Sequence, residues 1–151
     1  MAFRFSLQPI LRLRASVERL EQLRMLLLAA QIARVEREII SLEENLSAAR
    51  QLRLSSLSEG VSAAELHFDG AREKTRADQI RALHDVLTGF RRRHDEQRRL
   101  YQAARQKREI LENLRKRRFE EYRHEQLRRD QQRLDEAFLM RTGARRELPP
   151  Q

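Results

Sequence analysis

The chain contains 151 residues with no Trp and no Cys, and 36% of its residues are charged, 40% hydrophobic and 5% aromatic. That composition excludes a thick globular core, disulfide bonds, thiolate metal sites and cysteine nucleophiles, and it suits narrow apolar seams between helices. The net charge of +9 is concentrated in residues 91–133, which carry 16 basic and 8 acidic side chains. Such a stretch is typical of chains that bind nucleic acid, an anionic membrane or an acidic protein surface.

The first predicted helix spans residues 7–58. Ser6 is its expected N-cap, and Pro9 lies in the first turn, where its missing N–H costs nothing. Apolar residues then recur at helical spacing, which predicts a coiled-coil seam. The seam comprises Ile10, Leu13, Val17, Leu20, Met25, Leu28, Ile32, Val35, Ile39, Leu42, Leu46 and Ala49. The step from Val17 to Leu28 is eleven residues, which a strict heptad does not accommodate, so the supercoil is expected to relax there.

A turn and a second helical stretch follow. Gly60 is expected to close the first helix in a left-handed conformation, and Ser62 with Glu65 reads as a capping box. Because Gly70 and Gly89 interrupt the second stretch, we predict a shorter linking helix over residues 62–88 and a long helix over residues 90–140. Residues 142–151 are expected to form a flexible tail.

The expected fold is all-α: a long antiparallel two-helix coiled coil with a shorter linking helix, forming one hairpin domain over residues 1–141. The long helix of residues 90–140 pairs with the first helix in this prediction, so both termini lie at one end. The seam of the second stretch is weaker, because Arg and Lys stand between its apolar members. Those members are Ile80, Leu83, Leu87, Phe90, Tyr101, Ala104, Leu111, Leu114, Tyr122, Leu127, Leu134 and Phe138.

Residues that could carry catalysis do not converge in this pattern. A two-helix coiled coil offers almost no dry concavity in which reactive groups could be held together. The four histidines, His67, His84, His94 and His124, lack the helical spacing of a zinc site, and the four glycines are too far apart for a phosphate loop. We therefore expect no enzyme activity, no catalytic residue, no cofactor, no metal and no small-molecule substrate.

Two clusters of cations are candidates for binding, namely residues 91–93 and residues 115–118. A solvated charged helix and a binding surface explain them equally well. Base stacking would place aromatic residues beside the cations, and only Phe90, Phe119 and Tyr122 are near, so the sequence disfavours nucleic acid. Whether the basic stretch of residues 91–133 has its own ligand stays open at this point.

No apolar run approaches the roughly 20 residues needed to span a bilayer, since the longest is Met25 to Ala30. The first residues show neither an apolar signal core nor a small-residue cleavage pattern. We expect a cytoplasmic protein.

The two ends of the chain carry more specific patterns. Residues 3–14 read FRFSLQPILRLR, an aromatic-basic-aromatic tip followed by Leu-Gln-Pro and a Leu-Arg helix start. Residues 108–123 read REILENLRKRRFEEYR, and residues 131–138 read QQRLDEAF. Together these segments resemble the FliJ family of flagellar type III export components, and the length and helix layout fit across the whole chain. Between residues 54 and 89 the match is in helical character alone.

The resemblance implies a coiled-coil stalk of the flagellar export ATPase ring, similar in shape to the gamma subunit of rotary ATP synthases. It also implies contact with the membrane protein of the export gate and with substrate-chaperone complexes, and peripheral association with the inner-membrane export apparatus. The two ends would form a tip that enters the ATPase hexamer. The tip residues implied by this resemblance are Phe3, Arg4, Phe5, Leu7, Ile10, Leu11, Arg12, Leu13, Arg14, Arg133, Leu134, Phe138, Leu139 and Arg141.

A second contact, with the export gate, would use apolar residues away from the seam: Leu52, Leu54, Leu57, Leu66 and Phe68. Packing of the linking helix is the competing explanation for them. Three alternatives remain for the function: a basic coiled coil that binds nucleic acid or ribosomes, an export chaperone or scaffold that acts without a ring, and a component of a related secretion injectisome. The pattern fits a monomeric hairpin and an intermolecular coiled coil equally well.

Overall fold

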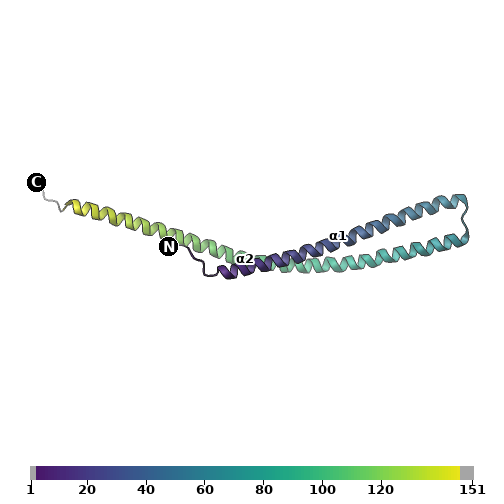
Figure 1. Cartoon of the computed structure of the whole chain (residues 1–151), viewed down its shortest axis with the longest axis horizontal. Coiled ribbons are helices and arrows are strands. Elements are labelled where there is room, and N and C mark those ends of the chain that lie inside the picture. Colours follow the sequence, from purple (N-terminus) through teal and green to yellow (C-terminus); the bar gives the residue numbers. More distant parts are fainter. Residues whose placement is uncertain (1–2, 147–151) are drawn as a thin grey trace. The chain divides into compact units, whose positions relative to one another are not determined.

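The computed structural model describes residues 3–146, which form two α-helices. Helix α1 spans Gln8–Glu59 and helix α2 spans Ala63–Arg146 (Figure 1). The predicted all-α, two-helix coiled-coil fold is confirmed. The chain divides into two units, which we describe separately. One, the hairpin unit, is residues 17–104; the other, the terminal unit, combines residues 1–16 with residues 105–151.

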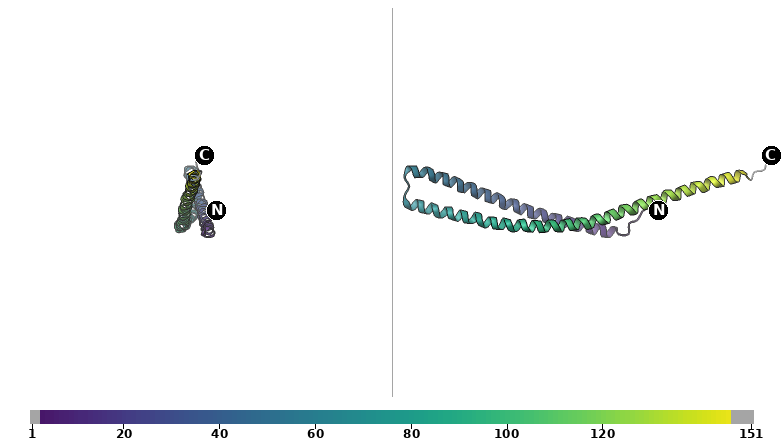
Figure 2. Two further views of the ribbon diagram at one scale, coloured as in Figure 1. Left: turned by 90° about the vertical axis from the view of Figure 1, so that its left-hand side faces the viewer. Right: turned by 180° about the vertical axis from the view of Figure 1, so that it is seen from behind.

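In the hairpin unit, the two helices lie side by side and antiparallel, as both views of the ribbon show (Figure 1; Figure 2). Pairs that join residues near and far from the turn fix this direction: Arg50 bonds Glu73, and Glu36 bonds Arg91. The hydrophobic core is a thin layer with no polar residue buried among the described side chains. It comprises Val35, Ile39, Leu46, Ile80 and Leu87, with Ile32, Leu42, Leu83 and Phe90 packed against it.

Helix α2 is continuous through Gly70 and Gly89, so the predicted separate linking helix of residues 62–88 is wrong. An interior Gly costs only about 1 kcal/mol relative to Ala, and the packing of a heptad seam outweighs that cost. Leu83, Leu87, Phe90 and His94 are all buried or half-buried at heptad spacing on both sides of Gly89. It is therefore the first half of α2 that pairs with α1 in the hairpin unit.

In α1, the heptad spacing of buried and half-buried positions continues through a stretch in which the residues at those positions are not apolar. Half-buried positions continue through Glu18 and Glu21 to Met25, so charged residues occupy the seam across the eleven-residue step. Gln97 donates from its Nε2 to the backbone carbonyl of Glu21 at 3.1 Å and to the Glu21 carboxylate. From Met25 to Ala49 the predicted seam is confirmed, whereas Leu20 is exposed.

The turn follows the local signals in the sequence. Gly60 has φ of +90°, the left-handed conformation that closes a helix without a Cβ clash. The backbone N–H of Ser62 donates to the Glu65 carboxylate at 3.1 Å, and the N–H of Glu65 donates to Ser62 Oγ at 3.3 Å. This is the predicted capping box, and it starts α2 after the three residues that follow α1.

The terminal unit contains the first residues of α1 and the second half of α2. Leu11 is buried, whereas Ile10 and Leu13, the predicted seam residues, are 44% and 61% exposed. The first turn closes when the N–H of Gln8 donates to the Phe5 carbonyl at 3.1 Å, with Pro9 in the first turn as predicted. Ser6 makes no side-chain hydrogen bond among the described residues, so its predicted capping role is not seen.

Helix α2 continues past the predicted end at residue 140 to Arg146, so residues 142–146 are helical rather than part of a tail. The rest of the predicted tail, residues 147–151, lies outside the described residues. Every described side chain from Leu127 to Thr142 is exposed. In the part of the chain that the structure describes, no helical stretch is both long and apolar enough to cross a membrane.

Candidate protein-binding groove

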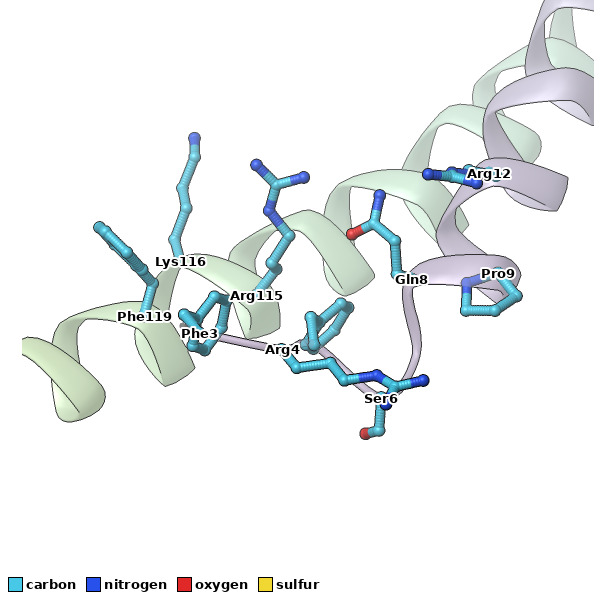
Figure 3. A pocket seen from close by; sticks show the side chains of 10 residues that line it. Phe3, Arg4, Ser6, Gln8, Pro9, Arg12, Arg115, Lys116 and Phe119 are labelled. Carbon is cyan, nitrogen blue, oxygen red and sulfur yellow. The ribbon is translucent and has the colours of Figure 1, made fainter. Parts of the chain in front are cut away.

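An open groove of about 880 Å³ lies between the N-terminal segment and α2 in the terminal unit (Figure 3). We call it the aromatic-basic groove. It is lined by Phe3, Arg4, Phe5, Ser6, Gln8, Pro9, Arg12, Arg115, Lys116 and Phe119. No carboxylate is among these residues, so the groove combines apolar rings with one sign of charge.

The aromatic part of the groove is held by ring contacts. The ring of Phe3 meets that of Phe119 edge to face, with centroids 5.3 Å apart, and lies 5.6 Å from the ring of Tyr122. Contacts of this kind are each worth about 0.5–1.5 kcal/mol beyond the area that they bury. They fix the N-terminal segment on α2, although that segment precedes the first helix.

The four cations of the groove are Arg4, Arg12, Arg115 and Lys116 (Figure 3). All four are exposed, and none forms an ion pair within residues 3–142, the range over which side chains are described. Like charges gathered around one concavity repel one another until an anion neutralises them. The groove therefore favours a negatively charged partner that also offers apolar surface to the rings.

The other cationic cluster differs, because its members already have partners. Arg91 pairs with Glu36 at 2.7 Å, Arg92 lies 3.8 Å from Glu96, and the guanidinium of Arg93 lies 5.7 Å from the centre of the Phe90 ring. Of the two clusters in the sequence, residues 91–93 support the hairpin, and residues 115–118 contribute two cations to the groove.

The structure brings together several of the predicted tip residues. Phe3, Arg4, Phe5 and Arg12 line the aromatic-basic groove. Leu7 lines a neighbouring groove between the same segment and α2. Leu11 is buried and Arg14 half-buried, so both belong to the seam rather than to an open surface, whereas Ile10 and Leu13 are exposed outside the groove.

The C-terminal members of the predicted tip do not join this cluster. The aromatic contacts of the N-terminal segment end at Tyr122, and Leu134, Phe138 and Leu139 are 71%, 67% and 66% exposed. Arg133 lies 3.9 Å from Asp130, one turn away on the same helix, and Arg141 is exposed.

Sequence reasoning missed Arg115, Lys116, Phe119 and Tyr122 as neighbours of the N-terminal segment. The pairing register of an antiparallel hairpin could have identified them, because residues at equal sequence distances from the turn lie opposite each other. Phe3 and Phe119 are each 58 residues from Val61, in the middle of the turn. The prediction of a separate linking helix concealed this relation.

Around the turn, the apolar residues predicted to contact an export gate remain largely open. Leu52, Leu54, Leu57 and Phe68 are 69%, 67%, 46% and 63% exposed, and Leu66 is half-buried. The guanidinium of Arg72 lies 5.7 Å from the centre of the Phe68 ring and covers part of it. Packing within the hairpin therefore does not account for four of these five residues.

A cluster of charges beside this surface links the helices. Arg50 bonds the Glu73 carboxylate at 2.7 Å and Arg53 contacts it at 2.8 Å. The hydrogen bond from Arg50 is the main reason that the pKa of Glu73 lies below its ordinary value. No group of His, Asp and Glu residues that could hold a metal ion occurs in the described part of the chain.

Comparison with known proteins identifies the family. The model of the Flagellar FliJ protein family matches residues 3–147, which is nearly the whole chain. No curated protein and no solved structure matches it significantly. The family consists of structural, chaperone-like flagellar components rather than known enzymes. The chain therefore belongs to the flagellar FliJ family and is a component associated with the flagellar export apparatus.

Proposed function

We propose that this protein is the coiled-coil stalk of the flagellar export ATPase ring and that the aromatic-basic groove is its principal ring contact. The observation that carries the proposal is the groove itself, in which three aromatic rings converge with four cations that pair with no carboxylate among the described side chains. Such a surface fits acidic loops of a protein ring that also present apolar side chains.

The exposed residues of α2 beyond the groove supply the rest of the contact in this proposal. The apolar surface and the one cation in this part of the contact are left uncovered by the described residues: Leu134, Phe138, Leu139 and Arg141. Exposed apolar residues gathered on one segment are typical of binding surfaces. The contact thus has a basic part at the groove and an apolar part on the helix.

A stalk of this kind would act through asymmetry. A two-helix element presents different side chains to each subunit of a near-symmetric hexamer, so it binds some nucleotide states better than others. Binding that discriminates between states shifts their populations, and it couples hydrolysis in one subunit to that in the next. The protein itself needs no reactive group for this role.

The exposed apolar residues around the turn are the proposed contact with the export gate. Leu52, Leu54 and Leu57 are on the last turns of α1, and Phe68 is near the start of α2. This contact would hold the protein at the cytoplasmic face of the inner membrane. Contact with substrate-chaperone complexes is part of the same proposal and rests on family membership alone.

The test is the rate of ATP hydrolysis by the cognate export ATPase with and without the protein. The double variant Arg12→Glu/Arg115→Glu reverses two groove cations while leaving the seam intact. Arg98→Glu/Arg99→Glu is the control, because it changes the net charge equally at exposed positions of the hairpin unit. Arg14 is avoided, since it is half-buried and its reversal would disturb folding.

We expect the groove variant to lose ring binding and stimulation of hydrolysis, and the control to keep both. Equal loss in both variants would show that net charge, rather than the groove, attracts the ring. RNA binding by the wild type that weakens steeply with salt, with no effect on hydrolysis, would replace the stalk with the basic nucleic-acid-binding alternative.

A further inference from the structure

One face of α2 beyond the groove has the pattern of a coiled-coil seam without a partner. Leu127, Gln131, Leu134 and Phe138 follow one another at steps of four, three and four residues. At 3.6 residues per turn they form one narrow stripe. Leu127, Leu134 and Phe138 are 62%, 71% and 67% exposed, so nothing described in the protein covers the stripe.

The N-terminal segment packs on a different side of the helix. Phe119 and Tyr122, which contact Phe3, precede Leu127 by eight and five residues, and these steps correspond to rotations of about 80° and 140° around a helix. Phe119 is also the last residue of α2 that lines the groove, about 12 Å before Leu127 along the helix axis. The stripe is therefore a separate surface from the aromatic-basic groove.

We propose that this stripe pairs with the same stripe of a second copy of the protein, in an antiparallel arrangement centred between Gln132 and Arg133. In this register Leu127 of one copy packs against Phe138 of the other, and Gln131 against Leu134. The overlap is short, so the dimer is weak and concentration-dependent.

The charges that flank the stripe favour a second copy of the protein as its partner, and they favour the antiparallel direction. The residues flanking the stripe across an antiparallel pair are Arg128 and Asp135, and the two-fold symmetry brings these opposite charges together twice. Both are exposed, and neither has an ion partner among the side chains described up to Thr142, whereas their neighbours do: Arg129 bonds Glu125 at 3.0 Å, and Arg133 lies 3.9 Å from Asp130.

A parallel pairing of the same stripes would be repulsive. It would place Asp130 of one copy beside Asp135 of the other, and Arg123 beside Arg128, so like charges would meet on both flanks. The antiparallel register is thus the one that both the apolar stripe and the flanking charges satisfy.

This inference goes beyond the proposed stalk function and does not depend on it. Leu134 and Phe138 belong to the proposed ring contact as well, so pairing of two copies and binding to the ring would compete. Copies away from the ring would cover their apolar stripes, and assembly onto the ring would separate them.

The experiment measures the association of the full-length protein by sedimentation over a concentration series up to millimolar. We expect a reversible dimer, with a Kd raised about tenfold in Arg128→Asp and in Asp135→Arg, because each variant turns two attractive pairs into repulsive ones. The double variant Arg128→Asp/Asp135→Arg should recover the wild-type Kd. Circular dichroism checks that every variant keeps its helix content.

Cysteine crosslinking then tests direction, since the chain has no Cys of its own. Leu127→Cys mixed with Phe138→Cys should form a disulfide between copies, and neither variant should crosslink efficiently alone. A protein that stays monomeric, a double variant that does not recover, or Leu127→Cys crosslinking to itself would each overturn the proposal. A monomer that still stimulates the ATPase would overturn the dimer and leave the stalk function standing.

Discussion

At the scale of single residues, the seam of the hairpin contains polar groups that are satisfied rather than buried alone. Gln97 reaches across from α2 and donates to the Glu21 carbonyl and carboxylate, while Arg24 bonds the same carboxylate at 2.9 Å. The cost of removing a carboxylate from water is offset only when its hydrogen bonds are replaced in this way. Such a layer fixes the register of a coiled coil at some loss of stability.

Replacing one residue of this polar layer should therefore lower the free energy of unfolding, whereas replacing both should raise it. Gln97→Leu leaves the Glu21 carboxylate half-buried without its donor from α2, and we expect a loss of about 1 kcal/mol in the free energy of unfolding. Glu21→Leu/Gln97→Leu should exceed the wild type by roughly 1 kcal/mol. Urea denaturation measures both, with the exposed Gln102→Leu as control, and a double variant less stable than the single one would contradict the argument.

A second polar contact gives the hairpin a dependence on pH. Arg50 and Arg53 lower the pKa of the Glu73 carboxyl, with the hydrogen bond from Arg50 as the first cause. A lowered pKa in the folded state means that the stabilisation is present above the ordinary pKa of Glu and disappears as the pH falls through the lowered value. In Arg50→Gln the pKa of Glu73 should rise toward its ordinary value, as an NMR titration of the carboxyl carbon would show. Arg76→Gln, which removes a nearby cation without a bond to Glu73, should change that pKa less.

At the scale of helices, glycine has opposite roles in different places. Gly89 lies within α2, where an added Cβ would meet nothing within 4 Å, whereas Gly60 holds φ of +90° at the turn. A helical glycine mainly adds flexibility to the unfolded chain, but a left-handed glycine adopts a conformation that other residues reach only with strain. The backbone conformation at a glycine therefore decides whether that glycine lowers or raises the stability of the protein.

Two alanine substitutions should separate these roles. Gly89→Ala is expected to raise the free energy of unfolding by about 0.5–1 kcal/mol, because it improves helix propensity without a clash. Gly60→Ala should lower it by about 1 kcal/mol or more, because the strain of the left-handed turn falls on the folded state. Thermal unfolding of both variants gives the sign of each change in stability. Stabilisation by Gly60→Ala would show that the turn can rearrange.

The same contrast explains which elements sequence analysis could predict. The capping box of Ser62 and Glu65 and the left-handed Gly60 are local, so the residues that determine them are adjacent in the sequence. The continuity of α2 through Gly89 depends on packing between Leu83, Leu87, Phe90 and residues of α1, which helix propensity does not contain. Likewise Glu18 and Glu21 occupy seam positions because of register, so a search for apolar spacing passed over them.

At the scale of the whole molecule, apolar burial is distributed unevenly. Most of the buried residues are in the hairpin unit, and Ile39 is 4% exposed there, whereas all described side chains from residue 127 onward are exposed. Stability should follow this distribution, since segments with few buried contacts open locally at low cost. The N-terminal half of the aromatic-basic groove could be predicted from residues 3–14, but the residues of α2 that complete it required the hairpin register.

A matched pair of truncations tests this distribution. Ile39→Ala should lower the free energy of unfolding by about 2–5 kcal/mol, because it leaves a cavity in the thin core. Leu134→Ala, at a residue 71% exposed, should change it by no more than about 0.5 kcal/mol. Hydrogen exchange should accordingly be faster in residues 127–142 than around Ile39, and equal protection of both segments would show that another contact covers the end of α2.

The three residues 60–62 that join the helices have a mechanical consequence. Fully extended, three residues span at most about 11 Å, and neighbouring helix axes are about 8–10 Å apart, so crossing between the helices uses nearly all of that length. Sliding one helix past the other by a heptad would move its end by roughly 10 Å along the axis, so the connection would have to span about 14 Å and turns of helix beside it would first melt. The hairpin therefore resists internal slippage, and an axial force applied to one helix is carried by both.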